Sequence, residues 1–131
     1  MNRLAFLFLT ACCVLILGCS QSVRKIADGY YLERFDENGM YYLIASGDSS
    51  NGGVFDGTIQ EIGWNRDWIL ARVTRLYHGD VSGWYALDLK AKQVIGPIQE
   101  SELKTNTDLS EIMCRDAAEA FSDRTVGGVG K

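Results

Sequence analysis

The chain has 131 residues, enough for one modest hydrophobic core, so its length predicts a single domain. With 47% hydrophobic residues, 23% charged residues and a single proline, its composition is that of a folded globular protein, which excludes a disordered or collagen-like chain. The 17 carboxylates outnumber the 13 Lys and Arg residues, so we do not expect a nucleic-acid binder that works by neutralising phosphates.

Residues 1–18 have the pattern of an export signal. A short positively charged head that ends at Arg3 precedes an apolar run from Leu4 to Leu17. The run has fourteen residues, whereas a helix that spans a bilayer needs about 20. We therefore predict a cleaved signal peptide and not a retained transmembrane helix.

The end of this signal resembles the lipobox of bacterial lipoprotein precursors. Ile16, Leu17 and Gly18 place two aliphatic residues and a small residue directly before Cys19. The resemblance implies cleavage before Cys19, a diacylglyceryl group on its sulfur and, often, acylation of the new amine. Several acyl chains hold a protein firmly on a membrane, whereas one chain binds only marginally. The alternative is an ordinary secretory signal in which Cys19 is incidental.

The mature chain is therefore expected to be exported and lipid-anchored to the bacterial cell envelope. Ser20, directly after the lipid cysteine, is compatible with the outer membrane if the organism has two membranes. Because Cys12 and Cys13 leave with the signal, Cys114 is the single free thiol of the mature domain, and no internal disulfide is expected. Its place in a predicted helix favours a buried, unreactive cysteine.

After a polar tether, residues 19–28, the pattern predicts one β-rich domain over residues 29–122 and a flexible tail over 123–131. Aromatic and aliphatic runs separated by turn signals predict a meander of about six antiparallel strands. The strands cover residues 29–35, 40–45, 54–62, 67–77, 84–89 and 94–97. Pro97 cannot continue a ladder, so we expect the sheet to end there.

One amphipathic helix is predicted to cover this sheet. Asp108 and Glu111 have the spacing of a capping box, and apolar residues recur on one helical face through about Ser122. The apolar residues of that face are Leu109, Ile112, Met113, Ala117, Ala120 and Phe121. The expected fold class is α+β, mainly antiparallel β-sheet with one C-terminal amphipathic helix.

Aromatic residues are the most distinctive feature of the predicted sheet, with nine Tyr and Trp between Tyr30 and Tyr85. Adjacent residues on a strand point to opposite faces, so one member of each adjacent pair should lie outside the core. Exposed Tyr and Trp favour recognition of a protein or a sugar. The alternative is a small two-layer fold that buries both faces. The pairs are Tyr30/Tyr31, Tyr41/Tyr42 and Trp84/Tyr85, and the candidate binding residues are Trp64, Trp68, Trp84 and Tyr85.

No cofactor or metal site is predicted. The loop from Asp48 to Gly53 lacks the ligands that a calcium loop needs at its fifth and twelfth positions, and the ending Val126–Lys131 lacks the first glycine of a phosphate-binding loop. His78 with Asp80 and one of Ser82, Ser49 or Ser50 could form a hydrolytic triad, but His78 and Asp80 lie two apart in one turn, which favours an exposed histidine.

Three functions remain open. The first is a lipid-anchored envelope module that recognises an envelope protein or a glycan through aromatic surface residues. The second is an envelope hydrolase that uses carboxylates or the His78 region, and the third is a structural accessory in which the tether matters more than any site. The order of motifs from Gly63-Trp64 to Gly96-Pro97 resembles small uncharacterised bacterial lipoproteins, and this resemblance implies no activity.

Overall fold

The computed structural model describes residues 22–35, 39–47, 52–75 and 82–123. In this part of the chain, eight strands and two short helices follow one another. The predicted fold class is confirmed, because the described chain is mainly antiparallel β-sheet with a small helical part. In chain order the elements are β1 (Val23–Ala27), β2 (Tyr30–Arg34), β3 (Tyr41–Ala45), β4 (Thr58–Trp64), β5 (Trp68–Thr74), β6 (Gly83–Asp88), β7 (Gln93–Ile98), α2 (Glu100–Thr105), β8 (Arg115–Asp116) and α3 (Ala117–Ser122).

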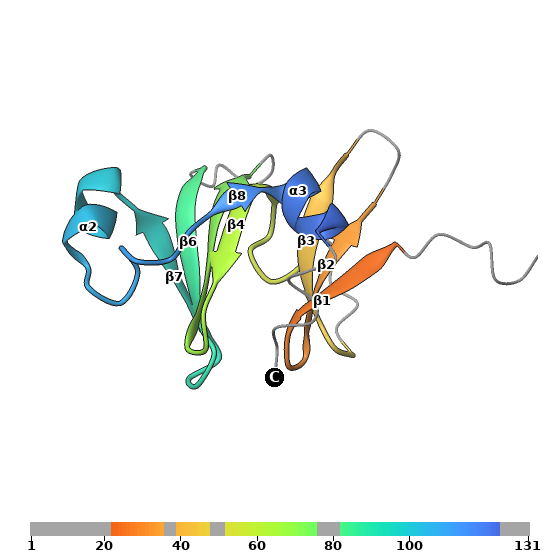
Figure 1. Ribbon diagram of the computed structural model, residues 1–131, viewed down its shortest axis with the longest axis horizontal. Helices are drawn as coiled ribbons and strands as arrows, with labels where there is room; N and C mark the ends of the chain where they lie inside the picture. The colour runs from red at the N-terminus through yellow and green to blue at the C-terminus, as the bar shows by residue number, and fades with distance from the viewer. Residues whose placement is uncertain (1–21, 36–38, 48–51, 76–81, 124–131) are drawn as a thin grey trace, which may run out of the picture.

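The described strands form two sheets, where the sequence predicts a single meander. A three-stranded sheet has the order β1-β2-β3, and a five-stranded sheet has the order β7-β6-β5-β4-β8. Figure 1 shows the two sheets face to face, with α3 at the top between them. The chain passes from one sheet to the other between β3 and β4, where Gly53 has a φ of +74° and a Cβ would lie 2.2 Å from the carbonyl oxygen of Leu43. Gly53 therefore lets the chain pass closely over Leu43 as it crosses from one sheet to the other.

The main core lies between the two sheets and consists of apolar side chains that alternate along each strand. Leu32 and Leu43 come from the three-stranded sheet, and Ile69, Ala71 and Val73 come from β5. Successive side chains of a strand point to opposite faces of the sheet, so every second side chain of each strand enters this core. Among the described residues, every buried side chain is hydrophobic. The core therefore depends on apolar burial, at about 25 cal/mol per Å².

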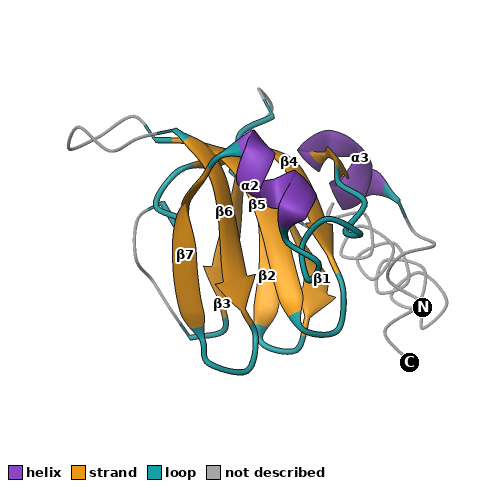
Figure 2. Cartoon of the chain, turned by 90° about the vertical axis from the view of Figure 1, so that its left-hand side faces the viewer, coloured by secondary structure: helices purple, strands orange, loops and turns teal. Residues whose placement is uncertain are grey.

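A second, smaller cluster lies on the other side of the five-stranded sheet. Leu70 and Ala86 point away from the main core and pack with Leu109, which is 1% exposed. Leu103 of α2 and Ile112 pack against the same cluster. Figure 2 shows α2 in front of the upper part of this sheet. The segment from α2 to residue 114 is thus a third layer over the sandwich.

Part of the predicted tether is a strand. Val23–Ala27 forms β1, which pairs with β2, and Ile26 is buried in the main core. The sequence does not predict this strand, because only Ile26 among its residues is buried and the residues around Ile26 are mostly polar. The predicted strand 94–97 corresponds to β7, which contains Pro97, ends one residue later and forms an edge of its sheet. An edge strand tolerates proline, since one side of its backbone makes no ladder hydrogen bonds.

The predicted C-terminal helix is wrong in its extent. The structure places a turn at residues 107–111, in which Asn106 Oδ1 accepts hydrogen bonds from the backbone N–H groups of Asp108 and Leu109 at 2.9 Å and 3.2 Å. The helix α3 contains only Ala117–Ser122. The apolar residues predicted to share one helical face divide between the two clusters, Leu109 in the smaller cluster and Ala117 in the main core. No helix in the described ranges is long and apolar enough to cross a bilayer.

Helix α3 closes the main core beside the first strand. Phe121 packs on Tyr41 with their ring centres 5.6 Å apart, and the Arg34 guanidinium lies 5.1 Å from the centre of the Phe121 ring. Arg24 Nη1 donates a hydrogen bond of 3.0 Å to the Phe121 carbonyl oxygen. The beginning and the end of the described chain are therefore joined directly.

Candidate binding surfaces

The five-stranded sheet has an outer face built from three rows of cross-strand neighbours. Because Ile69, Ala71 and Val73 point into the main core, the residues between them point outward. The strand pairings then fix the rows, since directly opposed residues share a face. The rows are Glu61-Arg72-Trp84-Ile98, Gly63-Leu70-Ala86-Ile95 and Trp68-Asp88-Gln93.

The four predicted binding residues do not come together on one surface. Trp68 and Trp84 lie on the outer face, where they pack beside the smaller cluster. Trp64 lies on the inner side and packs against the main core, and Tyr85 is buried there at 2% exposure. The alternation expected for Trp84/Tyr85 is thus observed, and it removes Tyr85 from any surface. We retain Trp68 and Trp84 as candidates.

Trp68 and Trp84 flank a row of smaller side chains. Gly63 and Ala86 lie in this middle row, and their small size leaves a shallow strip on the sheet surface between the two indoles. Leu109 and Ile112 fill this low strip from above. The backbone of the covering segment comes so close that a Cβ on Gly63 would lie 2.5 Å from the carbonyl oxygen of Met113. The chain itself therefore occupies the centre of this face and leaves the two tryptophans half-buried at its margins.

Exposed apolar side chains continue this surface toward the β7 edge. Ile95, in the same row as Leu70, is 42% exposed, whereas Val94 opposes the core residue Leu87 and so points to the other side of β7. Met113, on the segment that covers the strip, is 89% exposed. We call Trp68, Trp84, Ile95 and Met113 the tryptophan face. Exposed apolar groups collected in one region are typical of contacts with another macromolecule.

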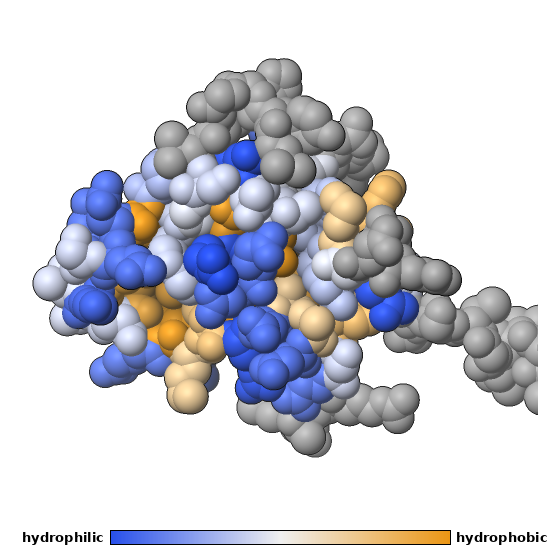
Figure 3. Space-filling view, turned by 90° about the horizontal axis from the view of Figure 1, so that it is seen from above, coloured by the Kyte–Doolittle hydropathy of each residue, from blue (hydrophilic) through white to orange (hydrophobic). Residues whose placement is uncertain are grey.

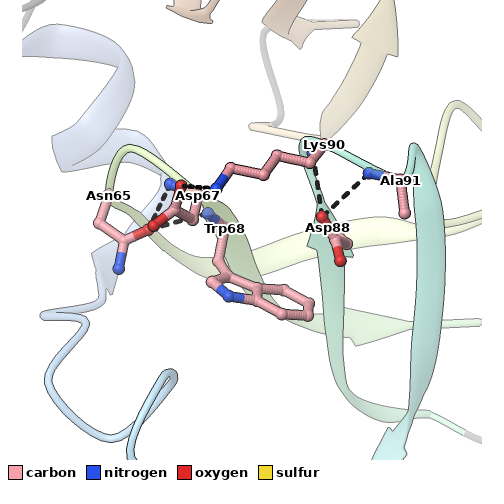
Figure 4. Close-up of polar contacts among 6 residues, drawn as sticks. All are labelled: Asn65, Asp67, Trp68, Asp88, Lys90 and Ala91. Carbon is pink, nitrogen blue, oxygen red and sulfur yellow. Dashed lines mark hydrogen bonds and ion pairs between the residues drawn. The ribbon is translucent and has the colours of Figure 1, made fainter.

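Two tight turns fix Trp68 at the end of this face (Figure 4). Asn65 Oδ1 accepts hydrogen bonds from the N–H groups of Asp67 at 2.9 Å and Trp68 at 2.8 Å. Asp88 Oδ1 accepts from the N–H groups of Lys90 and Ala91, at 2.9 Å and 3.1 Å. Lys90 Nζ also lies 3.6 Å from Asp67 Oδ1, which joins the two turns. Asx turns of this kind order the backbone on both sides of the indole.

The three-stranded sheet has a second outer face that the sequence reasoning did not single out. Leu32 and Leu43 point to the main core, so Tyr31 and Tyr42 point away from it. Phe35 follows β2 on the same side, is 69% exposed and meets the Tyr42 ring edge-on at 6.0 Å between centres. The adjacent pairs Tyr30/Tyr31 and Tyr41/Tyr42 indicated that one tyrosine of each pair lies outside the core. Alternation alone could not show which of the two points outward.

Cys114 is half-buried and lies directly before β8, outside any helix or strand, where the sequence predicts a helix. Its Sγ lies 3.8 Å from the carbonyl oxygen of Leu70. Burial, followed by the nearby negative charge of Glu61, raises the pKa of Cys114 to about 11. The group is therefore a protonated thiol at neutral pH and a weak nucleophile.

The residues considered for hydrolysis are only partly described. His78 and Asp80 lie outside the described residues, as do Cys19 and the loop 48–51. Ser82 Oγ accepts a hydrogen bond of 3.0 Å from the Arg75 N–H. Glu61 forms an ion pair with Arg72 at 2.5 Å across β4 and β5. Within the described ranges no three His, Cys, Asp or Glu residues gather in a way that could hold a metal ion.

Comparison of the chain with known protein families, with characterised proteins and with solved structures finds no match.

Proposed function

We propose that this protein is a lipid-anchored binding module of the bacterial cell envelope, which captures an envelope protein through the tryptophan face. The observation that carries the proposal is the placement of Trp68 and Trp84 on one outer face, continuous with the exposed Ile95. Tryptophan is the residue most enriched among those that dominate binding energy. The lipid on Cys19 supplies the anchor, and the β-sandwich presents the face.

The chemistry around the tryptophans favours a protein over a glycan. Trp84 lies in its row between the apolar Ile98 and Arg72, whose guanidinium is already paired with Glu61, and the apolar Ile95 lies in the next row. Asp88, the carboxylate directly opposite Trp68, uses Oδ1 to accept two backbone N–H groups of the following turn. A sugar site needs polar side chains that converge beside the aromatic ring, whereas a protein interface needs an apolar centre with a polar rim.

The anchor is tested separately from the binding face. Cys19→Ala should move the protein from the membrane fraction to the soluble fraction of the envelope, because it removes the acylated sulfur. A Cys19→Ala variant that stays in the membrane fraction would show that the lipid anchor is wrong.

The binding face is tested by placing a photo-crosslinking amino acid at residue 95 of the full chain in its native envelope. The matched control is the same amino acid at residue 23, because Val23 has a similar exposure of 40%, is also β-branched and lies in an edge strand of the other sheet. We expect residue 95 to give one stoichiometric protein adduct and residue 23 to lack it. Trp84→Ala should remove this adduct while the circular dichroism spectrum stays native.

Two results would contradict this function. The same adducts at residues 95 and 23 would mean that the tryptophan face has no selective partner. Retention of the protein on cell-wall glycan, lost in Trp84→Ala and without any protein adduct, would assign the face to a sugar.

A further inference from the structure

We propose that the outer face of the three-stranded sheet rests on the lipid bilayer at the end where the chain emerges from its anchor, with Phe35 and Val23 in the headgroup region. This inference rests on the lipid at Cys19 in the proposed function. It adds a second interaction surface, on the side of the sandwich opposite to the tryptophan face.

The first argument is the length of chain between the lipid and the fold. Strand β1 begins at Val23, and the carbonyl oxygen of Ser22 already accepts a hydrogen bond of 2.8 Å from the Arg34 N–H. Three residue steps separate Cys19 from Ser22, and at about 3.6 Å per residue they span at most about 11 Å. One headgroup layer is about 5 to 8 Å thick. The start of the sheet therefore stays beside the bilayer surface.

The second argument is which side chains lie at that start. The hydrogen bond from Arg34 to Ser22 places the end of β2 beside the beginning of β1. Phe35 follows Arg34 and therefore lies close to the point where the chain enters the sheet. Phe35 is 69% exposed. Its N–H donates to the Met40 carbonyl oxygen at 2.8 Å, so its backbone is held by the hairpin of β2 and β3. Figure 3 shows apolar residues at this right-hand end of the molecule, where the described chain begins.

The third argument is how the five exposed large hydrophobic residues of the described chain divide. Val94, Ile95 and Met113 belong to the β7 edge and the segment that covers the five-stranded sheet. Val23 and Phe35 belong to the three-stranded sheet, at the entry end. An exposed phenylalanine is costly in water but favourable in the headgroup region, where apolar side chains anchor peripheral proteins. Because Val23 and Phe35 lie beside the tether to the lipid, we infer that they contact the membrane.

The rest of the face fits an interfacial position. Tyr42 opposes Glu33, which opposes Val23, and Tyr31 opposes Ile44 in the next row. Tyrosine combines an apolar ring with a polar hydroxyl and is enriched at membrane interfaces. Lys25 opposes Tyr31 in that second row and pairs with Asp28 at 3.1 Å. The row at the entry end thus places an apolar and an aromatic side chain on either side of the Glu33 carboxylate, and Phe35 adds a second exposed ring at the same end.

The experiment uses the full lipidated protein in vesicles of phosphatidylethanolamine and phosphatidylglycerol. In a Cys114→Ala background, Phe35→Cys carries an environment-sensitive fluorophore, and some lipids carry a nitroxide quencher near the headgroup. Ile95→Cys is the matched control on the opposite side of the sandwich. Val23→Cys is a second test position, which keeps Phe35 in place. Mass spectrometry of the N-terminal peptide establishes the lipid on Cys19 in each preparation.

We expect blue-shifted emission and quenching by the lipids for labels at residues 35 and 23, and neither for the label at residue 95. A lipidated protein whose labels at 35 and 23 stay solvent-exposed and unquenched would overturn the membrane contact and leave the proposed function standing. A blue shift at residue 35 without quenching by lipid would assign the face to a contact with a second copy of this chain and also overturn the membrane contact. A preparation that has no lipid on Cys19 would remove both the anchor and this inference.

Discussion

Gly63 in β4 lies directly under the backbone of Met113, so that a Cβ on Gly63 would approach the Met113 carbonyl oxygen to 2.5 Å. This closeness lets residues 112–114 cross the outer face of the five-stranded sheet. The same Cβ would lie 2.9 Å from Cys114 Sγ and from Ile112 Cγ2. The third layer of the fold therefore depends on the absence of one side chain.

Gly63→Ala should lower the free energy of unfolding by about 1–3 kcal/mol, the usual cost of inserting a methyl group where the backbone must shift. Urea denaturation followed by tryptophan fluorescence measures it. Gln60→Ala, at an exposed position of the same strand, is the control and should change stability by less than about 0.5 kcal/mol. Equal stability of the two variants would mean that the covering segment is not held against Gly63.

Tyr85 and Trp84 are neighbours in sequence with different environments, and their alanine variants should differ accordingly. Tyr85→Ala should cost about 3–5 kcal/mol, because it empties a site in the main core, where the ring contacts Phe55 and the Arg75 guanidinium. Trp84→Ala should cost less, since the indole is half-buried at the margin of the smaller cluster. Thermal unfolding of both variants compares them. A larger loss for Trp84→Ala would invert the assignment of faces.

The thiol of Cys114 should make stability depend on pH in the alkaline range. Burial raises its pKa from 9.0 to about 11, so the folded state holds the proton more tightly than the unfolded state. The stabilising effect is complete below pH 9 and is lost as the pH rises toward 11. Urea midpoints between pH 8 and 11 should therefore fall more steeply for the native chain than for Cys114→Ala. Parallel curves would show that the thiol titrates in the same way in both states.

The Asx turn beside Trp68 should contribute more to stability than the ion pair that joins the two turns. Asn65→Ala removes an acceptor for two backbone N–H groups, and we expect a loss of about 1–2 kcal/mol. Lys90→Ala removes only an exposed pair and should cost less than about 0.5 kcal/mol. Chemical denaturation in low and high salt distinguishes the two. A salt-sensitive loss for Asn65→Ala would mean that charge, and not the turn, holds this end of the sheet.

The central strands were predictable from sequence because each has alternating apolar residues and clear turn signals. The segments predicted as strands near β2, β3, β5 and β6 all form strands. Strand β1 was missed because Ile26 is its one buried residue, and β8 because two residues carry no pattern. The predicted helix over residues 108–122 is too long, since only Ala117–Ser122 is helical, and this error has a different cause. Helical periodicity shows which residues are apolar, but it does not show which hydrophobic cluster each residue packs in. Leu109 and Ala117 pack in different clusters, so they do not share one helical face.

The binding surfaces show the same limit. Alternation correctly predicted that Trp84 and Tyr85 point to opposite faces, but it could not assign either residue to a face. That assignment depends on how the two sheets and the covering segment stack, which involves residues far apart in the chain. Phe35 gave no signal at all, because one phenylalanine at a strand end is equally compatible with a core and with a surface.

The bond between Arg24 and Phe121 joins residues 97 positions apart. The N-terminal strand therefore cannot obtain its final neighbours until nearly all of the chain is available. A polypeptide that is synthesised and exported from its N-terminus remains without its closing helix for most of that passage, and such distant contacts form slowly. The topology thus delays completion of the core until synthesis of the chain is nearly finished, which would suit the export that we propose for this protein.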